Sequence, residues 1–196
     1  MSDILTVKKA LRQESMEARR AISAEKKAAC ENKMMALFRS LASYRYADVL
    51  MLYYPLPDEL SFLPLAEEAL AKGKTVAFPK CGEEHRMDFH IVRSLDEDFE
   101  KGKYGLCEPK PNRPILDLQA DGRAKLCIIP ALVYDKDGYR LGYGKGYYDR
   151  YLSGFAGTKV GFSYDDLIKD RIPRGRFDLA VDLLITEKGV RNLHAH

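Results

Sequence analysis

The densest group of residues that could do chemistry lies between residues 137 and 150, where the chain reads Asp-Gly-Tyr-Arg-Leu-Gly-Tyr-Gly-Lys-Gly-Tyr-Tyr-Asp-Arg. Four glycines fall within nine residues, and Arg140, Lys145 and Arg150 carry positive charge. Glycine lets the backbone turn tightly and approach a ligand, so that successive N–H groups can surround an anion. We therefore predict a polyphosphate site here, between a strand and the N-terminus of a helix.

Two familiar nucleotide-binding motifs do not fit this glycine-rich loop, which we define as residues 138–146. In a Walker A loop the lysine is followed by serine or threonine, whereas Lys145 is followed by Gly146. The dinucleotide-binding fingerprint needs the spacing G-x-G-x-x-G, whereas the glycines here follow G-x-G-x-G. The alternative interpretation is a turn that only connects a strand to a helix, and the three cations favour the anion site.

Cations also recur along the expected N-terminal helix. Arg12 and Arg19 follow Lys8 by four and eleven residues, which places the three side chains within ~40° of one another on an α-helix. They form one basic stripe. From these residues alone, a solvent-exposed helix face is the favoured interpretation and an anion site is the alternative.

A third group follows an apolar run and reads Tyr-Tyr-Pro-Leu-Pro-Asp-Glu at residues 53–59. A flat aromatic ring and a carboxylate could hold a planar heterocycle, by stacking on it and by accepting hydrogen bonds from its N–H groups. Tyr53 or Tyr54 could supply the ring, and Asp58 or Glu59 the carboxylate. A core tyrosine beside a surface acid explains the same residues equally well.

Two aspartates, Asp149 and Asp178, could converge on Mg²⁺, which takes one or two carboxylates together with phosphate oxygens. For either residue alone, a helix cap or an ion pair is the simpler interpretation. No Ser/His/Asp or Cys/His arrangement stands out, which disfavours a covalent hydrolase. The four cysteines form no CxxC pair, which argues against a zinc site or a disulfide framework.

The hydrophobic pattern predicts a scaffold in which strands and helices alternate. Helices are expected over residues 4–22, over a segment that follows the N-cap Ser23 and buries Cys30, Met34, Leu37, Phe38 and Leu41, and over Phe62–Ala71 and Tyr147–Leu152. Strands are expected over Val49–Tyr54, Thr75–Phe78 (ended by Pro79), Met87–Val92, Leu126–Val133, Lys159–Phe162 and Leu179–Thr186, with an ordered loop over Glu100–Pro114.

This alternation predicts an α/β fold, a Rossmann-like three-layer domain with a mostly parallel sheet and helices on both faces. The 196 residues suit a single domain over residues 1–196. Ligands of such sheets bind beyond the carboxyl ends of the strands. The glycine-rich loop and the segment after Tyr54 both follow expected strands, so we expect them at that edge.

Charge and hydropathy narrow the classes of partner. The net charge is +3, which is too small by itself to indicate nucleic-acid binding. No apolar run approaches the ~18 residues that a membrane span needs. We expect a cytoplasmic protein, more readily a monomer than an obligate oligomer, with no membrane or nucleic-acid partner. A non-catalytic nucleic-acid-binding module, using the basic stripe and the loop tyrosines, remains an alternative.

Taken in order, the motifs resemble those of the 5-formyltetrahydrofolate cyclo-ligase family, also called 5,10-methenyltetrahydrofolate synthetases. The most specific element is RLGYGKGYYDR at residues 140–150. Further support comes from KKALR at 8–12, Tyr54 with Glu59, GLCEP at 105–109, IPA at 129–131 and LITEKGV at 184–190. The resemblance covers nearly the whole chain.

The resemblance implies an ATP- and Mg²⁺-dependent enzyme that converts 5-formyltetrahydrofolate to 5,10-methenyltetrahydrofolate, releasing ADP and phosphate. Arg140 and Lys145 would be catalytic, and Asp149 and the more loosely matched Asp178 would serve the metal. ATP would contact Lys8, Lys9, Ala10, Leu11, Arg12, Arg140, Leu141, Gly142, Tyr143, Gly144, Lys145, Gly146, Tyr147 and Tyr148. The folate would contact Tyr54, Glu59, Tyr143, Gly144, Lys145, Gly146 and Tyr147.

The implied reaction suits this set of residues. ATP would phosphorylate the formyl oxygen, and N10 would then close the ring as phosphate leaves. Phosphoryl transfer depends mainly on alignment and charge stabilisation, which backbone N–H groups, Lys, Arg and Mg²⁺ supply. Another nucleotide-dependent transferase or kinase on the same fold is the alternative enzyme.

Overall fold

Seven strands form the central sheet of the computed structural model, which describes residues 4–84, 86–102, 105–119 and 122–193. Their order across the sheet is β11-β10-β9-β6-β1-β2-β3. The five inner strands run parallel, and the edge strands β3 and β11 run antiparallel to their neighbours. The strands are β1 (Val49–Met51), β2 (Thr75–Cys81), β3 (Met87–Val92), β6 (Lys125–Ile129), β9 (Thr158–Phe162), β10 (Leu183–Thr186) and β11 (Gly189–Asn192).

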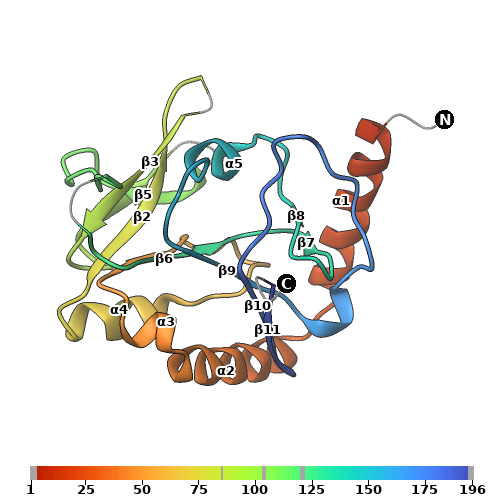
Figure 1. Ribbon diagram of the computed structural model, residues 1–196, viewed down its shortest axis with the longest axis horizontal. Coiled ribbons are helices and arrows are strands. Elements are labelled where there is room, and N and C mark those ends of the chain that lie inside the picture. Colours follow the sequence, from red (N-terminus) through yellow and green to blue (C-terminus); the bar gives the residue numbers. More distant parts are fainter. Residues whose placement is uncertain (1–3, 85, 103–104, 120–121, 194–196) are drawn as a thin grey trace.

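Helices cover both faces of this sheet. In Figure 1, α2, α3 and α4 lie below the sheet, α5 lies above it, and α1 stands at one end. The helices are α1 (Ile4–Arg20), α2 (Ala24–Ser40), α3 (Ala42–Arg45), α4 (Leu63–Ala71), α5 (Tyr147–Tyr151) and the 3-10 turn η2 (Asp165–Leu167). The expected α/β, Rossmann-like arrangement is confirmed. Within the described ranges, no helix is both long enough and apolar enough to cross a bilayer.

The inner strands are apolar throughout because both faces of the sheet are buried. Along β6, Leu126 and Ile128 pack into the core on the side of α2 and α4. The intervening Cys127 and Ile129 pack into the core on the side of α5. Alternate residues of one strand therefore serve two cores, which explains why the sequence shows an unbroken apolar run there.

The start of α2 matches its sequence signal. Ser23 is the N-cap, and its hydroxyl accepts a hydrogen bond from the Lys26 backbone N–H at 3.2 Å, which satisfies one of the N–H groups left open at a helix start. Phe38 is fully buried beneath the sheet, as predicted. Leu37 and Leu41, which were also expected to be buried, are partly buried at the margin of the same core.

The prediction that Pro79 ends β2 was wrong. β2 continues through Pro79 to Cys81 by antiparallel pairing with β3. Its parallel pairing with β1 already stops at Ala77, whose carbonyl accepts from Leu52 N–H. Residues two apart direct their backbone groups to the same side of a strand. The N–H that proline lacks would therefore point to the side of β2 that faces β1. The pairing with β1 has already ended there, so the missing donor costs no hydrogen bond between strands.

The segment expected to be an ordered loop, Glu100–Pro114, contains a short strand. β5 (Cys107–Pro109) pairs antiparallel with β4 (Phe99–Lys101) in a separate two-stranded sheet. Glu108 in β5 is buried, and its carboxylate accepts a hydrogen bond from Cys81 N–H at 3.1 Å. A buried charged residue between glycines and prolines gives no strand signal, which is why the pattern missed it.

Other boundaries also moved. β1 stops at Met51, three residues before the expected end, because the chain leaves the sheet towards Pro55 and Pro57. The expected strand Leu126–Val133 is divided by Pro130, and β7 (Val133–Tyr134) then pairs with β8 (Arg140–Leu141) in a hairpin. β10 begins at Leu183 rather than Leu179, and the antiparallel β11 was not expected.

The strand order places a crevice between β1 and β6. The chain proceeds from β1 to β2 on one side, whereas β6, β9 and β10 follow one another on the other side. At such a reversal the connections that leave two neighbouring strands diverge, and ligands bind between them. The segment that ends at Glu59 leaves β1, and the glycine-rich loop follows β6 by way of the β7–β8 hairpin.

Candidate active site at the carboxyl end of the sheet

The glycine-rich loop runs from the β7–β8 hairpin into α5, and two of its glycines are required by geometry. Gly146 is the N-cap of α5 with φ of +67°, a left-handed conformation that side chains rarely adopt. Gly144 has φ of +93°, and a Cβ there would lie 3.0 Å from Arg12 Nη2. Glycine therefore shapes the loop and lets α1 come close to it.

The basic stripe of α1 faces the protein, not solvent. Arg12 donates from Nε to the Gly142 carbonyl at 2.9 Å. Lys8 Nζ lies 2.7 Å from Asp178 Oδ2. Arg19 is buried and donates to backbone carbonyls of the two loops that leave β1 and β6. The interpretation as a solvent-exposed helix face is overturned, because each of the three cations contacts a loop of the crevice.

The neighbouring positions of the KKALR motif face elsewhere. Lys9 and Ala10 are exposed, and no hydrogen bond or ion pair of Lys9 is found in the described part of the chain. Leu11 packs beside Val133, Leu141 and Ile172. Of these five positions, the structure brings the charged groups of Arg12 to the glycine-rich loop and of Lys8 to Asp178, and it brings the Leu11 side chain to Leu141.

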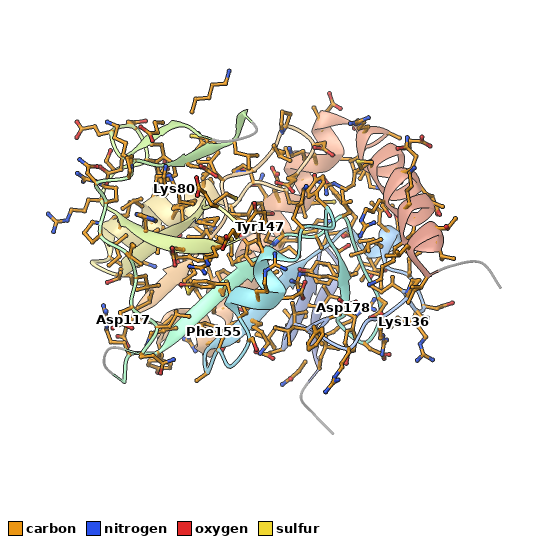
Figure 2. All side chains as sticks on the ribbon, turned by 90° about the horizontal axis from the view of Figure 1, so that it is seen from above. Lys80, Asp117, Lys136, Tyr147, Phe155 and Asp178 are labelled. Atoms are coloured by element: carbon orange, nitrogen blue, oxygen red, sulfur yellow. The ribbon has the colours of Figure 1, made fainter. Side chains whose placement is uncertain are left out.

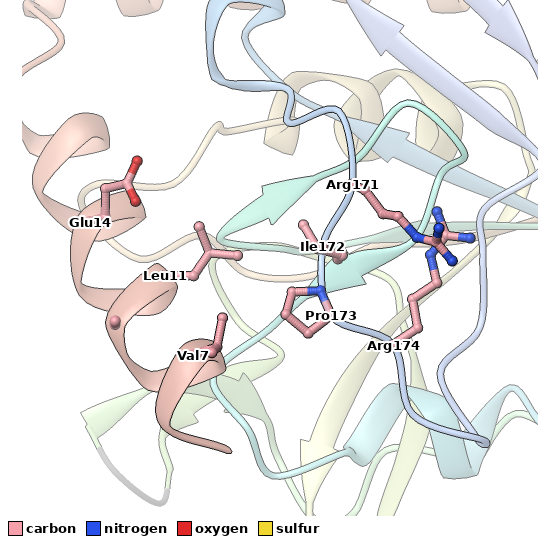
Figure 3. Close-up of a pocket in the computed structure, with 8 residues that line it drawn as sticks. Val7, Leu11, Glu14, Arg171, Ile172, Pro173 and Arg174 are labelled. Atoms are coloured by element: carbon pink, nitrogen blue, oxygen red, sulfur yellow. The ribbon is translucent and has the colours of Figure 1, made fainter. Parts of the chain in front are cut away.

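Ala10 and Leu11 instead line a groove of about 620 Å³ between α1 and residues 171–174 (Figure 3). Its walls are mostly aliphatic, and Glu14 at its rim pairs with Lys169 at 2.6 Å. Arg174 on the opposite wall is held by Asp135. The groove thus adjoins the basic stripe through a shared helix, and two of its charged groups, Glu14 and Arg174, are already paired.

Arg140 is the most deeply buried cation of the loop, with a side chain 5% exposed. Its guanidinium donates to Asp149 Oδ1 at 2.9 Å and to the Leu179 carbonyl at 3.1 Å. Asp149 also accepts from Leu179 N–H. Arg140 and Asp149 thus join β8, α5 and the long loop before β10, and Arg140 places a positive charge beneath the glycine-rich loop.

Asp178 lies at the open side of the same group. Figure 2 looks down on this end of the molecule, with Tyr147 near its centre and Asp178 on the side nearer α1. Burial alone would raise the pKa of Asp178, but hydrogen bonds from Lys8 Nζ and Gly175 N–H bring the pKa below its ordinary value. The carboxylate is therefore held in its charged form.

Asp149 and Asp178 each form an ion pair, with Arg140 and Lys8, as the simpler interpretation expected, and each could still offer an oxygen to a magnesium ion that is completed by phosphate oxygens. The hydrogen bonds found in the described residues engage Oδ1 of Asp149 and Oδ2 of Asp178, so one oxygen of each carboxylate remains for another ligand. No cluster of three or more metal-binding side chains occurs in the described ranges. Mg²⁺ commonly takes only one or two carboxylates and relies on phosphate and water for the rest.

Glu59 and Tyr143 meet across the crevice. The Tyr143 hydroxyl donates to Glu59 Oε1 at 3.5 Å, and Leu56 N–H donates to Glu59 Oε2 at 2.9 Å. Burial raises the pKa of Glu59, although Leu56 N–H and Arg19 act against it. Burial of its hydroxyl and the nearby Glu59 charge raise the pKa of Tyr143 to about 12. Glu59 is 5% exposed, so it is not the surface acid of the simpler interpretation.

Tyr54 is positioned differently from Glu59. Its ring centroid lies 5.2 Å from that of Phe99 and 6.5 Å from that of Phe78. Burial and the neighbouring Cys107 thiol raise the pKa of Tyr54. The side chain is half-buried at the edge of an aromatic cluster, where it can offer a ring edge to a ligand beside β5.

The remaining residues of the loop divide into exposed and buried groups. Lys145 is exposed, and its ammonium has no hydrogen bond or ion pair within the described ranges. Arg150 donates to the Lys145 carbonyl and so stabilises the turn. The Tyr148 hydroxyl is buried without a hydrogen-bond partner among the described residues, beside Phe89 and below Arg140. The loop thus offers an exposed cation, and the first turn of α5 holds a buried hydroxyl group without a partner among the described residues.

The sequence analysis missed Asp135, which organises the hairpin below the loop. This fully buried carboxylate accepts from the backbone N–H groups of Asp137, Tyr139 and Ile172, and from Arg174 at 2.8 Å. An aspartate three residues before Gly138 is typical of a turn. That signal was present in the sequence, but no prediction was made from it.

Comparisons with known proteins agree with this geometry. The sequence model of the 5-formyltetrahydrofolate cyclo-ligase family matches residues 5–187. The probable 5-formyltetrahydrofolate cyclo-ligase of Schizosaccharomyces pombe is 34% identical over 158 residues, which are 72% of this chain and 76% of that protein. The solved structure of Aquifex aeolicus 5,10-methenyltetrahydrofolate synthetase is 32% identical, with a TM-score of 0.83 over 97% of this chain and 94% of that one.

A second solved structure extends the comparison. The 5,10-methenyltetrahydrofolate synthetase of Mycoplasma pneumoniae is 26% identical, with a TM-score of 0.71 over 92% of this chain and 98% of that one. Both structures therefore share the fold of this chain along nearly their full length. On the match of the family model and these relatives, the chain belongs to the 5-formyltetrahydrofolate cyclo-ligase family.

Proposed function

We propose that this chain converts 5-formyltetrahydrofolate to 5,10-methenyltetrahydrofolate with consumption of ATP, in the presence of Mg²⁺, and with release of ADP and phosphate. The observation that carries the proposal is the meeting of the glycine-rich loop with the Glu59 segment, where Tyr143 reaches Glu59 at 3.5 Å. One side of this contact suits a polyphosphate, and the other suits a heterocycle rich in N–H donors.

Folate recognition falls to the side formed by Glu59. An ionised carboxylate has two acceptor oxygens and can pair with adjacent N–H donors of a pterin. Tyr54 supplies an aromatic edge on the same segment, and the half-exposed Tyr143 ring supplies another surface from the opposite wall. The formyl group of a pterin held in this way would face the tip of the glycine-rich loop.

ATP recognition falls to residues 140–148 and to the basic stripe. Arg12 lies against Gly142 and Gly144, so phosphates in the loop would meet its guanidinium. Arg140 adds a fixed charge from below, and Lys145 is exposed at the loop tip. We assign the stabilisation of charge on the transferred phosphoryl group to two residues. Lys145 would act by direct contact, and Arg140 would act through the electrostatic field of its buried guanidinium.

Asp149 and Asp178 would hold Mg²⁺ through the oxygen of each carboxylate that the protein leaves without a hydrogen bond. When bound, the ion would neutralise charge on the phosphate groups. Lys8 and Arg140 keep these two carboxylates in place. The role of the chain's own residues here is therefore to fix two anionic oxygens at the mouth of the phosphate site.

The reaction needs no side-chain nucleophile. The formyl oxygen forms a bond to the γ-phosphorus of ATP as the bond to ADP breaks. N10 then bonds to the formyl carbon, the carbon–oxygen bond breaks, and phosphate leaves with that oxygen while the N10 proton is lost. Both steps depend on alignment and on charge held by the loop.

The test is a direct assay. The protein is mixed with Mg·ATP and 5-formyltetrahydrofolate, and methenyl absorbance is followed together with ADP. We expect one ADP for each methenyl product and no product without ATP. A stable phosphorylated folate in place of the methenyl product would show a kinase instead. ATP hydrolysis that ignores the folate would also contradict the proposal.

A further inference from the structure

Arg19 is the cation of the basic stripe that the proposed mechanism leaves without a function. Its side chain is 6% exposed and comes from the last turns of α1. Its Nε donates to the Asp58 carbonyl at 3.2 Å, and its Nη1 donates to the Ala131 carbonyl at 3.1 Å. One guanidinium therefore links α1 to the segment that leaves β1 and to the segment that leaves β6.

The third nitrogen of Arg19 points at the carboxylates of the Asp58–Glu59 turn. Nη2 lies 3.6 Å from Asp58 Oδ2 and 4.0 Å from Glu59 Oε1. It is buried and has no hydrogen-bond partner among the described residues. A buried donor without a partner is costly, so its presence beside a buried carboxylate calls for an explanation.

A small cavity lies at this contact. It has a volume of about 20 Å³, and its lining includes Arg19, Glu59, Tyr53 and Ser163. The contact between Nη2 and the Glu59 carboxylate is therefore not closely packed, while Arg19 Nε holds the carbonyl of Asp58, the residue before Glu59.

We propose that Arg19 is a positioning residue, which holds the Asp58–Glu59 turn and compensates the buried Glu59 charge so that this carboxylate can bind the pterin. The inference rests on the proposed function for the identity of the ligand. The anchoring contacts to Asp58 and Ala131 stand apart from it. Arg19 acts through Glu59 and need not touch the substrate.

The charge balance around Glu59 supports this role. Burial raises the pKa of Glu59, and Arg19 is the cation that lowers it, while Asp58 raises it further. The titratable groups that face Glu59 come from every neighbouring element: Arg19 of α1, Asp58 of its own turn, Tyr53 after β1, Tyr143 of the glycine-rich loop and Tyr148 of α5. Removing Arg19 leaves the buried Glu59 carboxylate with the hydrogen bonds from Leu56 N–H and the Tyr143 hydroxyl but without the cation that lowers its pKa.

The first experiment needs no substrate. The Glu59 carboxyl carbon is followed by NMR against pH in the wild type, in Arg19→Met and in Arg20→Met. Arg20 is the matched control, because it is the next residue on α1 and is exposed. We expect the midpoint of the Glu59 titration to rise by about one pH unit or more in Arg19→Met, because an opposite charge within ~4–6 Å shifts a pKa on that scale. In Arg20→Met the midpoint should stay unchanged. An unchanged midpoint in Arg19→Met would overturn the proposal.

The second experiment separates a link through Glu59 from a general structural effect. We expect Arg19→Met to raise the folate KM about tenfold, with little change in the ATP KM. The acid limb of the folate KM profile should move to higher pH. In a Glu59→Gln background the same change should add little, because the group that Arg19 positions is already altered. Equal effects in both backgrounds, or an equal rise in both KM values, would contradict the role.

Arg19→Lys covers the case in which Arg19→Met does not fold. Lysine keeps the charge but cannot donate to both carbonyls as the planar guanidinium does. We expect a midpoint for Glu59 near that of the wild type and a folate KM raised about threefold or more. A wild-type folate KM in Arg19→Lys would overturn the anchoring role. If the wild type forms no methenyl product, the proposed function fails, while the titration still decides whether Arg19 compensates Glu59.

Discussion

At the scale of single residues, the cations of the site divide by what they already contact. Arg19 and Arg140 are buried and bound to backbone carbonyls, and Arg140 also holds Asp149. Lys145 is exposed at the tip of the glycine-rich loop. Buried and bound cations shape the site and supply a constant field, whereas an exposed ammonium can move with a reacting group.

Replacement of Lys145 by alanine is expected to lower kcat by about 100-fold or more, the scale of losing one donor aimed at transition-state charge. The melting temperature should not change, because the side chain is exposed. Steady-state kinetics and thermal unfolding provide the measurements. Lys33→Ala, another exposed lysine on α2, is the control. Turnover that stays at the wild-type level in Lys145→Ala would remove this residue from the catalytic group.

Replacement of Glu59 by glutamine tests recognition rather than turnover. The side-chain volume is kept, but one acceptor oxygen becomes an N–H₂ donor that meets the donors of the pterin. The folate KM is expected to rise by about tenfold or more, while the ATP KM changes little. Initial-rate kinetics with each substrate varied in turn gives both values. A rise confined to the ATP KM would assign Glu59 to the nucleotide instead.

At the scale of elements, sequence patterns predicted the helices and strands whose formation depends on residues close together in the sequence. The apolar run of β6 and the Ser23 cap of α2 each follow from residues within a few positions. β5 was missed because its buried Glu108 pairs with Cys81 N–H, a distant partner that no local pattern records. The β7–β8 hairpin was missed although Asp135 accepts from the nearby Asp137 and Tyr139 N–H groups, a local turn signal that was not used, while its contact with Arg174 is distant in the sequence.

The start of α5 gives an element-scale prediction. Gly146 has φ of +67°, and a Cβ there would lie 3.1 Å from Arg150 Nη1. Gly146→Ala is expected to destabilise the protein by about 1–2 kcal/mol, since a left-handed conformation costs that much for a residue with a Cβ, and to raise the ATP KM. Urea unfolding and kinetics measure the two effects. Gly122→Ala, where a Cβ would meet nothing within 4 Å, should change neither.

The contact between α2 and α4 gives a prediction for acid pH. Hydrogen bonds to Glu68 from Lys72, Arg39 and Tyr44 outweigh its burial and lower its pKa to about 2. Because the folded pKa is below the unfolded one, this carboxylate stabilises the fold above about pH 4.5, and the contribution is lost as pH falls towards 2.

Glu68→Gln should therefore flatten the loss of stability between about pH 4.5 and pH 2. Urea unfolding at a series of pH values provides the measurement. The neighbouring Glu67 is exposed, and Glu67→Gln serves as the control on the same helix. If the free energy of unfolding falls as steeply with acidification in Glu68→Gln as in Glu67→Gln, the hydrogen bonds to Glu68 do not form in solution.

At the scale of the whole molecule, the site depends on strand order. Arg19, Glu59 and Tyr143 are far apart in sequence and meet because β1 and β6 are neighbours at the reversal of the sheet. Residue types alone identified the glycine-rich loop and left Glu59 balanced between site and surface. In the structure Glu59 is buried beside Arg19 of α1, so it is not a surface acid, and helical spacing alone shows only that the cations of α1 share one face.

Ligand binding at this crevice should stabilise the whole fold. A ligand at about 100 times its Kd adds about 2.7 kcal/mol, which for a chain of this size raises Tm by about 5–11 °C. We expect such a shift with Mg·ATP and a clearly smaller one when EDTA removes the metal, because Asp149 and Asp178 then face the phosphates without a cation between them. Asp178→Asn, compared with its own ligand-free Tm, should also show a reduced shift. Equal Tm shifts with and without the metal would mean that ATP binding does not depend on a metal ion held by the two aspartates.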